Sequence, residues 1–144
     1  MSLVNSVGYD KFANNKFVPR GLWNQEKRGM FDSYEAAALA SGSTITMFRP
    51  PKGAKYAGSG QLAWDDLAGA AATIAVGIAG ATDKFLTATD VQSAADKADL
   101  DAGAGAVDAL GYEFDGETDV ILTTAGGNAI TGTIKLLMDI LLPN

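Results

Sequence analysis

The clearest hydrophobic pattern in the chain is an alternation with a period of two near its C-terminal end. Apolar residues occupy every second position there, at Ile134, Leu136, Met138, Ile140 and Leu142. Thr, Lys and Asp fill most of the positions between them, although Leu137 and Leu141 interrupt this polar face. Because successive strand side chains point to opposite faces, the pattern predicts a long strand with one face in a core.

A second β-prone run precedes this strand. The run Glu117–Thr124 is separated from it by Ala125-Gly-Gly-Asn-Ala129. Glycine and asparagine tolerate the positive φ that tight reversals require. We therefore expect residues 117–142 to form a β-hairpin.

Further strands follow from the same reasoning. Thr44–Phe48 alternates as a half-buried strand, and Pro50-Pro51 ends it at a sheet edge or corner, because proline cannot donate to a central ladder. Lys55–Gly60 is expected to restart the backbone on the facing sheet. Thr73–Ile78 alternates most cleanly, and Asp83–Thr89 reads as its hairpin partner.

Three segments are harder to interpret. Met30–Ala40 fits either a helix capped by Ser33 or a strand, and we favour the strand because it leads into strand-like sequence. Gln61–Leu67 fits a strand ending in a turn or a single helical turn. Asp90–Leu110 has few apolar residues, and we expect a surface loop with some local helix.

About seven or eight short strands, separated by Gly, Pro, Asp and Ser turns, favour an all-β fold. We predict a β-sandwich or jelly-roll-like domain over residues 29–144, preceded by an extended N-terminal arm over residues 1–28.

The predicted arm combines large apolar and basic side chains without any period. It either folds back over its own domain or lies on a neighbouring subunit. Since aromatic and arginine side chains carry much of the energy of protein interfaces, the arm supplies the candidate interface. The candidate protein-interface residues are Phe12, Phe17, Arg20, Trp23, Lys27 and Arg28.

Charge is divided unevenly along the chain. Residues 1–56 hold eight basic and four acidic residues, whereas residues 57–144 hold three basic and thirteen acidic ones. A basic front and an acidic body suit head-to-tail contacts between copies or contact with an acidic surface, and chance together with solubility is the alternative. A pI near 4.4 argues against a nucleic-acid partner.

Reactive chemistry is sparse. The chain has no cysteine and no histidine, so thiolate sites, thiol nucleophiles and serine–histidine triads do not exist in it. The acidic groups Asp65-Asp66 and Asp96/Asp99/Asp101 lack catalytic or calcium-loop spacing, and Gly53–Gly60 lacks the Gly-Lys-Ser/Thr ending of a phosphate loop. We predict a chain that is not an enzyme and needs no cofactor or metal.

Membrane features are also weak. The longest uncharged run, residues 67–82, is shorter than the roughly 20 residues that a membrane helix needs. The first residues show no basic and apolar secretory pattern. We expect a soluble chain made in a cytoplasm, without a membrane partner.

Three stretches carry a family resemblance. The first is Ser43–Ala54, which ends in Arg-Pro-Pro-Lys-Gly-Ala. The second is Leu62–Thr89, which contains an Asp-Leu-Ala-Gly corner and a Val-Gly strand. The third is Glu117–Asp139, in which Thr-Asp-Val-Ile-Leu-Thr-Thr-Ala-Gly-Gly is followed by Thr-Gly-Thr-Ile. In this order they resemble the small β-sandwich accessory proteins of tailed-phage virions.

The resemblance implies a structural virion protein of the head-decoration (cement) type, assembled in a bacterial cytoplasm. Such a protein binds the outside of the head and bridges capsid subunits, with the major capsid protein and copies of itself, as a trimer or another small ring, as partners. A neck, tail or fibre-base virion protein is one alternative. The other is a carbohydrate-binding β-sandwich, for which the candidate platforms are Trp23, Tyr56, Trp64 and Tyr112.

Overall fold

The computed structural model describes residues 26–68, 70–92, 94–100 and 109–142. Within these residues the chain forms eight β-strands. Their bounds are β1 (Lys27–Leu39), β2 (Thr44–Phe48), β3 (Lys55–Trp64), β4 (Thr73–Ile78), β5 (Ala81–Asp90), β6 (Asp96–Asp99), β7 (Val120–Ala125) and β8 (Ile130–Leu141).

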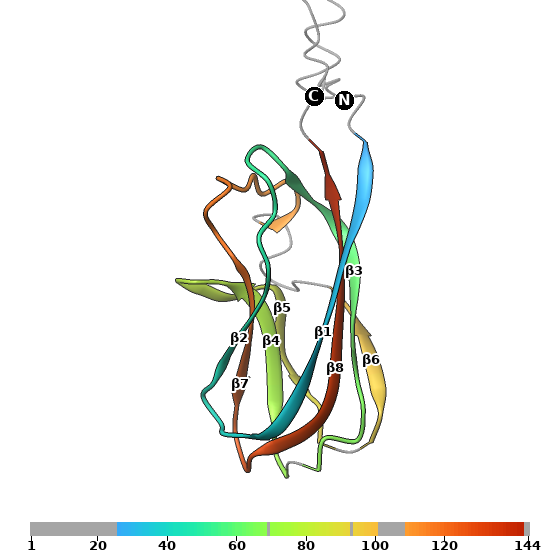
Figure 1. Cartoon of the computed structure of the whole chain (residues 1–144), viewed down its shortest axis with the longest axis vertical. Helices are drawn as coiled ribbons and strands as arrows, with labels where there is room; N and C mark the ends of the chain where they lie inside the picture. The colour runs from blue at the N-terminus through green and yellow to red at the C-terminus, as the bar shows by residue number, and fades with distance from the viewer. Residues whose placement is uncertain (1–25, 69, 93, 101–108, 143–144) are drawn as a thin grey trace, which may run out of the picture.

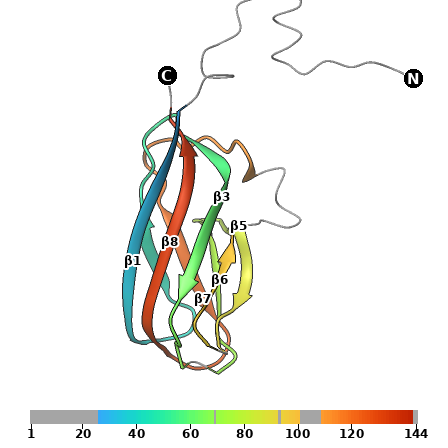
Figure 2. The same cartoon turned by 90° about the vertical axis from the view of Figure 1, so that its right-hand side faces the viewer.

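The strands form two four-stranded antiparallel sheets that pack face to face (Figures 1 and 2). Sheet A has the order β1-β8-β3-β6, and sheet B has the order β2-β7-β4-β5. The predicted all-β sandwich is confirmed. β1 enters and β8 leaves at the same end of the sandwich, where Lys27 is paired with Leu141 and the Leu142 amide donates to the Glu26 carbonyl at 2.8 Å.

The predicted C-terminal hairpin is wrong. β7 lies in sheet B between β2 and β4, and β8 lies in sheet A between β1 and β3, so residues 126–129 cross from one layer to the other. Gly126 and Gly127 do adopt positive φ, but their backbone packs against Ala70 and Ala71 instead of closing a two-stranded turn. Both strands have apolar faces that reach the shared core by taking central positions in opposite sheets.

Most of the other strand predictions are confirmed. Met30–Ala40 is a strand, Lys55 restarts the backbone in the facing sheet, and β4 pairs with β5. Trp64 ends β3, so the Gln61–Leu67 segment is a strand that runs into a turn. β2 is an edge strand, as its prolines indicated.

The Asp90–Leu110 prediction is wrong in part. Asp96–Asp99 is strand β6, which pairs with Gln61–Trp64 at the edge of sheet A. Asp101, from the acidic group singled out in the sequence, lies outside the described residues together with the rest of 101–108.

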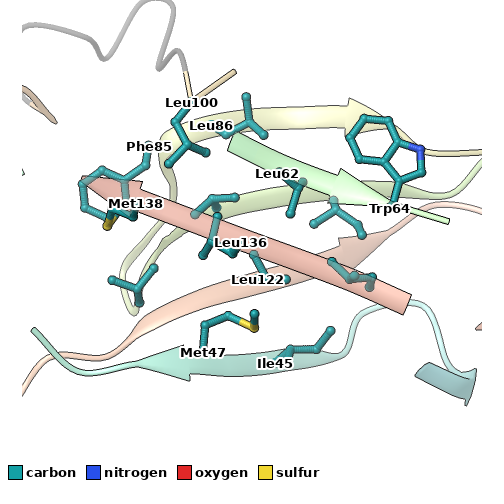
Figure 3. Packing of buried hydrophobic residues seen from close by; sticks show 14 of the residues in the cluster. Ile45, Met47, Leu62, Trp64, Phe85, Leu86, Leu100, Leu122, Leu136 and Met138 are labelled. Atoms are coloured by element: carbon teal, nitrogen blue, oxygen red, sulfur yellow. The ribbon is translucent and has the colours of Figure 1, made fainter. Parts of the chain in front are cut away.

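The core lies between the two sheets. Ile134, Leu136, Met138 and Ile140 of β8 are almost fully buried, as their alternation predicted. Figure 3 shows side chains of sheet A, such as Leu62 and Leu136, meeting those of sheet B, such as Leu122. At the end where β3 begins, an aromatic cluster forms from Tyr56, Phe85, Tyr112 and Phe114, with ring centroids 4.7–6.3 Å apart.

Candidate protein-contact surface

The acidic residues singled out in the sequence serve local structure. Asp65 accepts a hydrogen bond from the Asp66 amide, and Asp66 accepts one from the Ala68 amide, so both carboxylates organise the turn after β3. In the part of the chain that the structure describes, no group of three or more acidic, histidine or cysteine side chains could hold a metal ion. Nor is any helix among these residues long and apolar enough to cross a membrane.

Two large apolar side chains are exposed side by side on the outer face of sheet A. Among the described residues, the exposed large hydrophobic side chains are Phe31, Leu110 and Leu137, with exposed fractions of 62%, 62% and 38%. Phe31 of β1 lies directly opposite Leu137 of β8 in the strand register. Gly29 lets the Leu137 side chain pack close to the β1 backbone, since a Cβ at position 29 would lie only 3.3 Å from Leu137 Cδ1. Neighbouring exposed apolar side chains such as Phe31 and Leu137 are typical of an interaction surface.

A shallow groove lies beside this pair, with a volume of about 480 Å³. We call it the sheet A groove, and it is lined by Gly58, Ser59, Gly60, Gln61, Asp99, Leu100, Leu137 and Asp139. It forms where the β3–β8 pairing is irregular between Tyr56 and Gly60, and both Gly58 and Gly60 have positive φ. Leu110 borders the groove, because a Cβ at Gly58 would come within 2.6 Å of Leu110 Cδ1.

Two carboxylates give the groove a negative character. Asp99 accepts a hydrogen bond from the Gln61 side-chain amide at 3.0 Å. Asp139 accepts one from the Ser59 hydroxyl at 2.6 Å and forms an ion pair with Lys27 at 3.5 Å. A carboxylate has about four acceptor positions, so both can accept further hydrogen bonds from a partner.

Only two of the six interface residues expected from the sequence belong to the part of the chain that the structure describes. Phe12, Phe17, Arg20 and Trp23 lie outside it. Lys27 and Arg28 belong to β1. Lys27 borders the groove through its ion pair with Asp139, whereas Arg28 pairs with Glu26 at 2.8 Å.

Sequence reasoning did not single out Phe31, Leu110 or Leu137 as surface residues. One signal was present, because Leu137 breaks the otherwise polar face of its strand. The groove itself left no signal, since it depends on the irregular β3–β8 register and on the approach of β6.

A separate charged contact ties two strands of sheet B together. Arg49, just after β2, donates two hydrogen bonds to Asp119, just before β7, at 2.7 and 3.2 Å. The hydrogen bond from Arg49 lowers the pKa of the Asp119 carboxyl. Nearby, the amide of Glu117 and the hydroxyl of Thr118 donate to Asp115 and lower its pKa in the same way.

Two of the four carbohydrate platforms named from the sequence are buried. Tyr56 and Trp64 are buried, and the Trp64 indole donates a hydrogen bond to the Ala94 carbonyl at 3.0 Å. Tyr112 is half-buried, with the Lys84 ammonium 4.6 Å from its ring centroid. Trp23 lies outside the described residues.

No protein-family model matches the chain, and no curated protein matches it in sequence. Its fold, however, is similar to that of chains in solved phage capsid structures. A chain of the cyanophage Pam1 capsid asymmetric unit matches with a TM-score of 0.64 and 21% identity, over 84% of this chain and 88% of that chain. A chain of the Ralstonia phage GP4 capsid matches with a TM-score of 0.65 and 20% identity, over 83% and 86%.

A third match comes from the acid-stable capsid of Helicobacter pylori bacteriophage KHP30. Its TM-score is 0.55 and its identity 16%, over 83% of this chain and 95% of that chain. Because the shared region covers most of both partners in every match, the three capsid chains are similar in length to this one. The chain therefore shares its fold, over more than four fifths of its length, with small chains of three phage capsid structures.

Proposed function

We propose that the chain is a structural virion protein of the capsid-decoration (cement) type, which binds the outside of a phage head and bridges capsid subunits. The observation that carries this proposal is that more than four fifths of the chain matches the fold of chains of similar length in three phage capsid structures. The resemblance of Ser43–Ala54, Leu62–Thr89 and Glu117–Asp139 to phage accessory proteins points the same way.

The proposed mechanism is passive. The sandwich is a rigid body, and an exposed apolar pair such as Phe31 and Leu137 gains free energy when another protein covers it. A single contact made by two apolar side chains is weak, but several copies bound together gain avidity without new contacts. Binding to the assembled shell but not to its dissociated parts stabilises the shell by linkage.

A glycan-binding role has less support. Sugar platforms need exposed aromatic rings, yet Tyr56 and Trp64 are committed to the core. A glycan array that gives no binding at high protein concentration is the expected result. Saturable binding of one glycan class would favour the carbohydrate-binding alternative instead.

The test is a binding assay with capsids of the parent phage that lack this protein. Purified chain is added to expanded heads, and the heads are sedimented and assayed for bound protein and for thermal resistance. We expect saturation at a copy number comparable to that of the major capsid protein, together with a raised melting temperature of the heads. Binding restricted to the neck or tail of complete particles would instead support the second virion role.

A further inference from the structure

We propose that the sheet A groove binds residues 12–23 of a second copy of this chain, so that copies join head to tail. This inference names a partner for the surface described above. Its tests use the purified chain without capsids, so it can fail while the role in the virion holds, and the reverse is equally possible.

The groove and the arm carry complementary apolar side chains. The groove is bordered by Leu110 and Leu137, with Phe31 on the adjoining strand, and these are the large apolar side chains that the described surface leaves exposed. The arm supplies the matching group, because Phe12, Phe17 and Trp23 are aromatic. Interface centres are enriched in aromatic anchors that fill apolar hollows.

The groove and the arm also carry opposite charges. Asp99 and Asp139 line the groove, and Lys27 pairs with only one of them. Residues 1–25 carry three basic side chains, Lys11, Lys16 and Arg20, against one acidic side chain, Asp10. An arginine among aromatic residues can donate several hydrogen bonds to a carboxylate while its neighbours cover apolar surface.

The geometry of the chain entry favours a second copy over the same chain. Glu26 still runs beside the end of β8, because its carbonyl accepts a hydrogen bond from the Leu142 amide. The groove residues Asp139 and Leu137 pair with β1 positions three and five residues further on, which is roughly 10–16 Å along the strand. To cover the groove of its own chain, the arm would have to reverse direction just before Glu26. The arm of another copy can enter the groove without this reversal.

An arm-to-groove contact joins two different surfaces of the same chain. Such a heterologous contact builds a closed ring when the rotation between copies closes, and a filament when it does not. The contact therefore accounts for a small ring of copies without any symmetric dimer face. It also uses the basic front and the acidic body of the chain in one interface.

Thiol cross-linking tests the contact directly, because the native chain has no cysteine. Asn24→Cys reports the arm and Gln61→Cys reports the groove. A mixture of the two single variants, treated with a short bismaleimide, should give covalent heterodimers, and the double variant should give a ladder of oligomers. Thr46→Cys, exposed on sheet B, replaces Gln61→Cys in the control and should give no heterodimer with Asn24→Cys.

Two outcomes of the cross-linking experiment would overturn the proposal. If the mixture gives no heterodimer and the double variant cross-links only within one chain, the arm binds its own domain and the proposal is wrong. If neither experiment gives a product that exceeds the Thr46→Cys control, the arm does not occupy the groove at all and the proposal is also wrong.

A charge exchange separates recognition from folding. Arg20→Glu and Asp99→Lys should each weaken self-association in sedimentation velocity on the order of tenfold, and the two changes combined should restore it. Asp83→Lys makes the same charge change at an exposed position of β5 and should leave association unchanged. Association that is unaffected by the single changes, or not restored by the pair, would overturn the proposal.

Discussion

The crossover between the two sheets makes a sharp prediction at Gly127. This residue has a φ of 55°, and a Cβ at its position would overlap the carbonyl oxygen of Ala70. The same carbonyl accepts a hydrogen bond from the Asn128 amide at 3.2 Å. Gly127→Ala must therefore do more than strain one residue, because it must push the crossover away from the segment that it packs against.

The expected cost has separable parts. A positive φ costs an alanine about 1–2 kcal/mol. Forcing an extra carbon into a closed contact costs about 1–3 kcal/mol, and losing the Asn128 hydrogen bond costs about 1 kcal/mol. Gly127→Ala should thus lower the free energy of unfolding by about 3–6 kcal/mol in all.

Gly80 provides the matched control. Its φ is 85°, and nothing lies within 4 Å of a Cβ built there, so Gly80→Ala carries only the backbone strain. Thermal unfolding followed by circular dichroism should show a melting temperature lowered by about 3–6 °C for Gly80→Ala and by about 10 °C or more for Gly127→Ala. Urea unfolding should rank the two variants in the same order.

This comparison distinguishes a crossover from a surface hairpin. At the tip of a solvated hairpin, Gly127 would have open space beside it, and alanine there would cost no more than at Gly80. Equal losses for the two variants would therefore refute the packing of residues 126–129 against Ala70 and Ala71.

Three further predictions follow from other parts of the molecule. Leu136→Ala should cost about 2–5 kcal/mol in urea unfolding because its side chain is fully buried, whereas Leu137→Ala on the opposite face of β8 should cost far less. The hydrogen bond from Arg49 lowers the pKa of Asp119, so the ionised carboxylate contributes stability above about pH 4. This stability is lost as the pH falls through the lowered pKa. Asp119→Asn should therefore show a smaller drop in melting temperature between pH 7 and pH 3 than the native chain. Deletion of residues 1–25 should leave a folded monomer by sedimentation that no longer binds heads, and undiminished binding would contradict an arm-mediated contact.

The alternation of side chains was enough to place most strands and to choose their buried faces. The inward residues of β8, from Ile134 to Ile140, followed from period two alone, because one face of the strand had to be apolar. The same pattern carries no information about which strand lies alongside. Gly126-Gly127-Asn128 suits a hairpin turn and an inter-sheet crossover equally well, since both need positive φ.

β6 could not be predicted from the sequence, for a different reason. It is a four-residue edge strand with Asp96, Lys97 and Asp99 exposed, so it shows no apolar alternation. Only its backbone pairing with β3 makes it a strand. The groove is hidden in the same way, because the left-handed Gly58 and Gly60 and the bulge between β3 and β8 arise from pairing over long sequence separations.

The proposed role, a structural protein of the phage head, can be tested by imaging. Cryo-electron microscopy of the parent virion, combined with quantification of the chain relative to the major capsid protein, gives both its place and its copy number. We expect hundreds of copies distributed over the outer surface of the head, each a β-sandwich that bridges capsid subunits. A few copies confined to a single vertex or to the tail, or the absence of the chain from the particle, would contradict it.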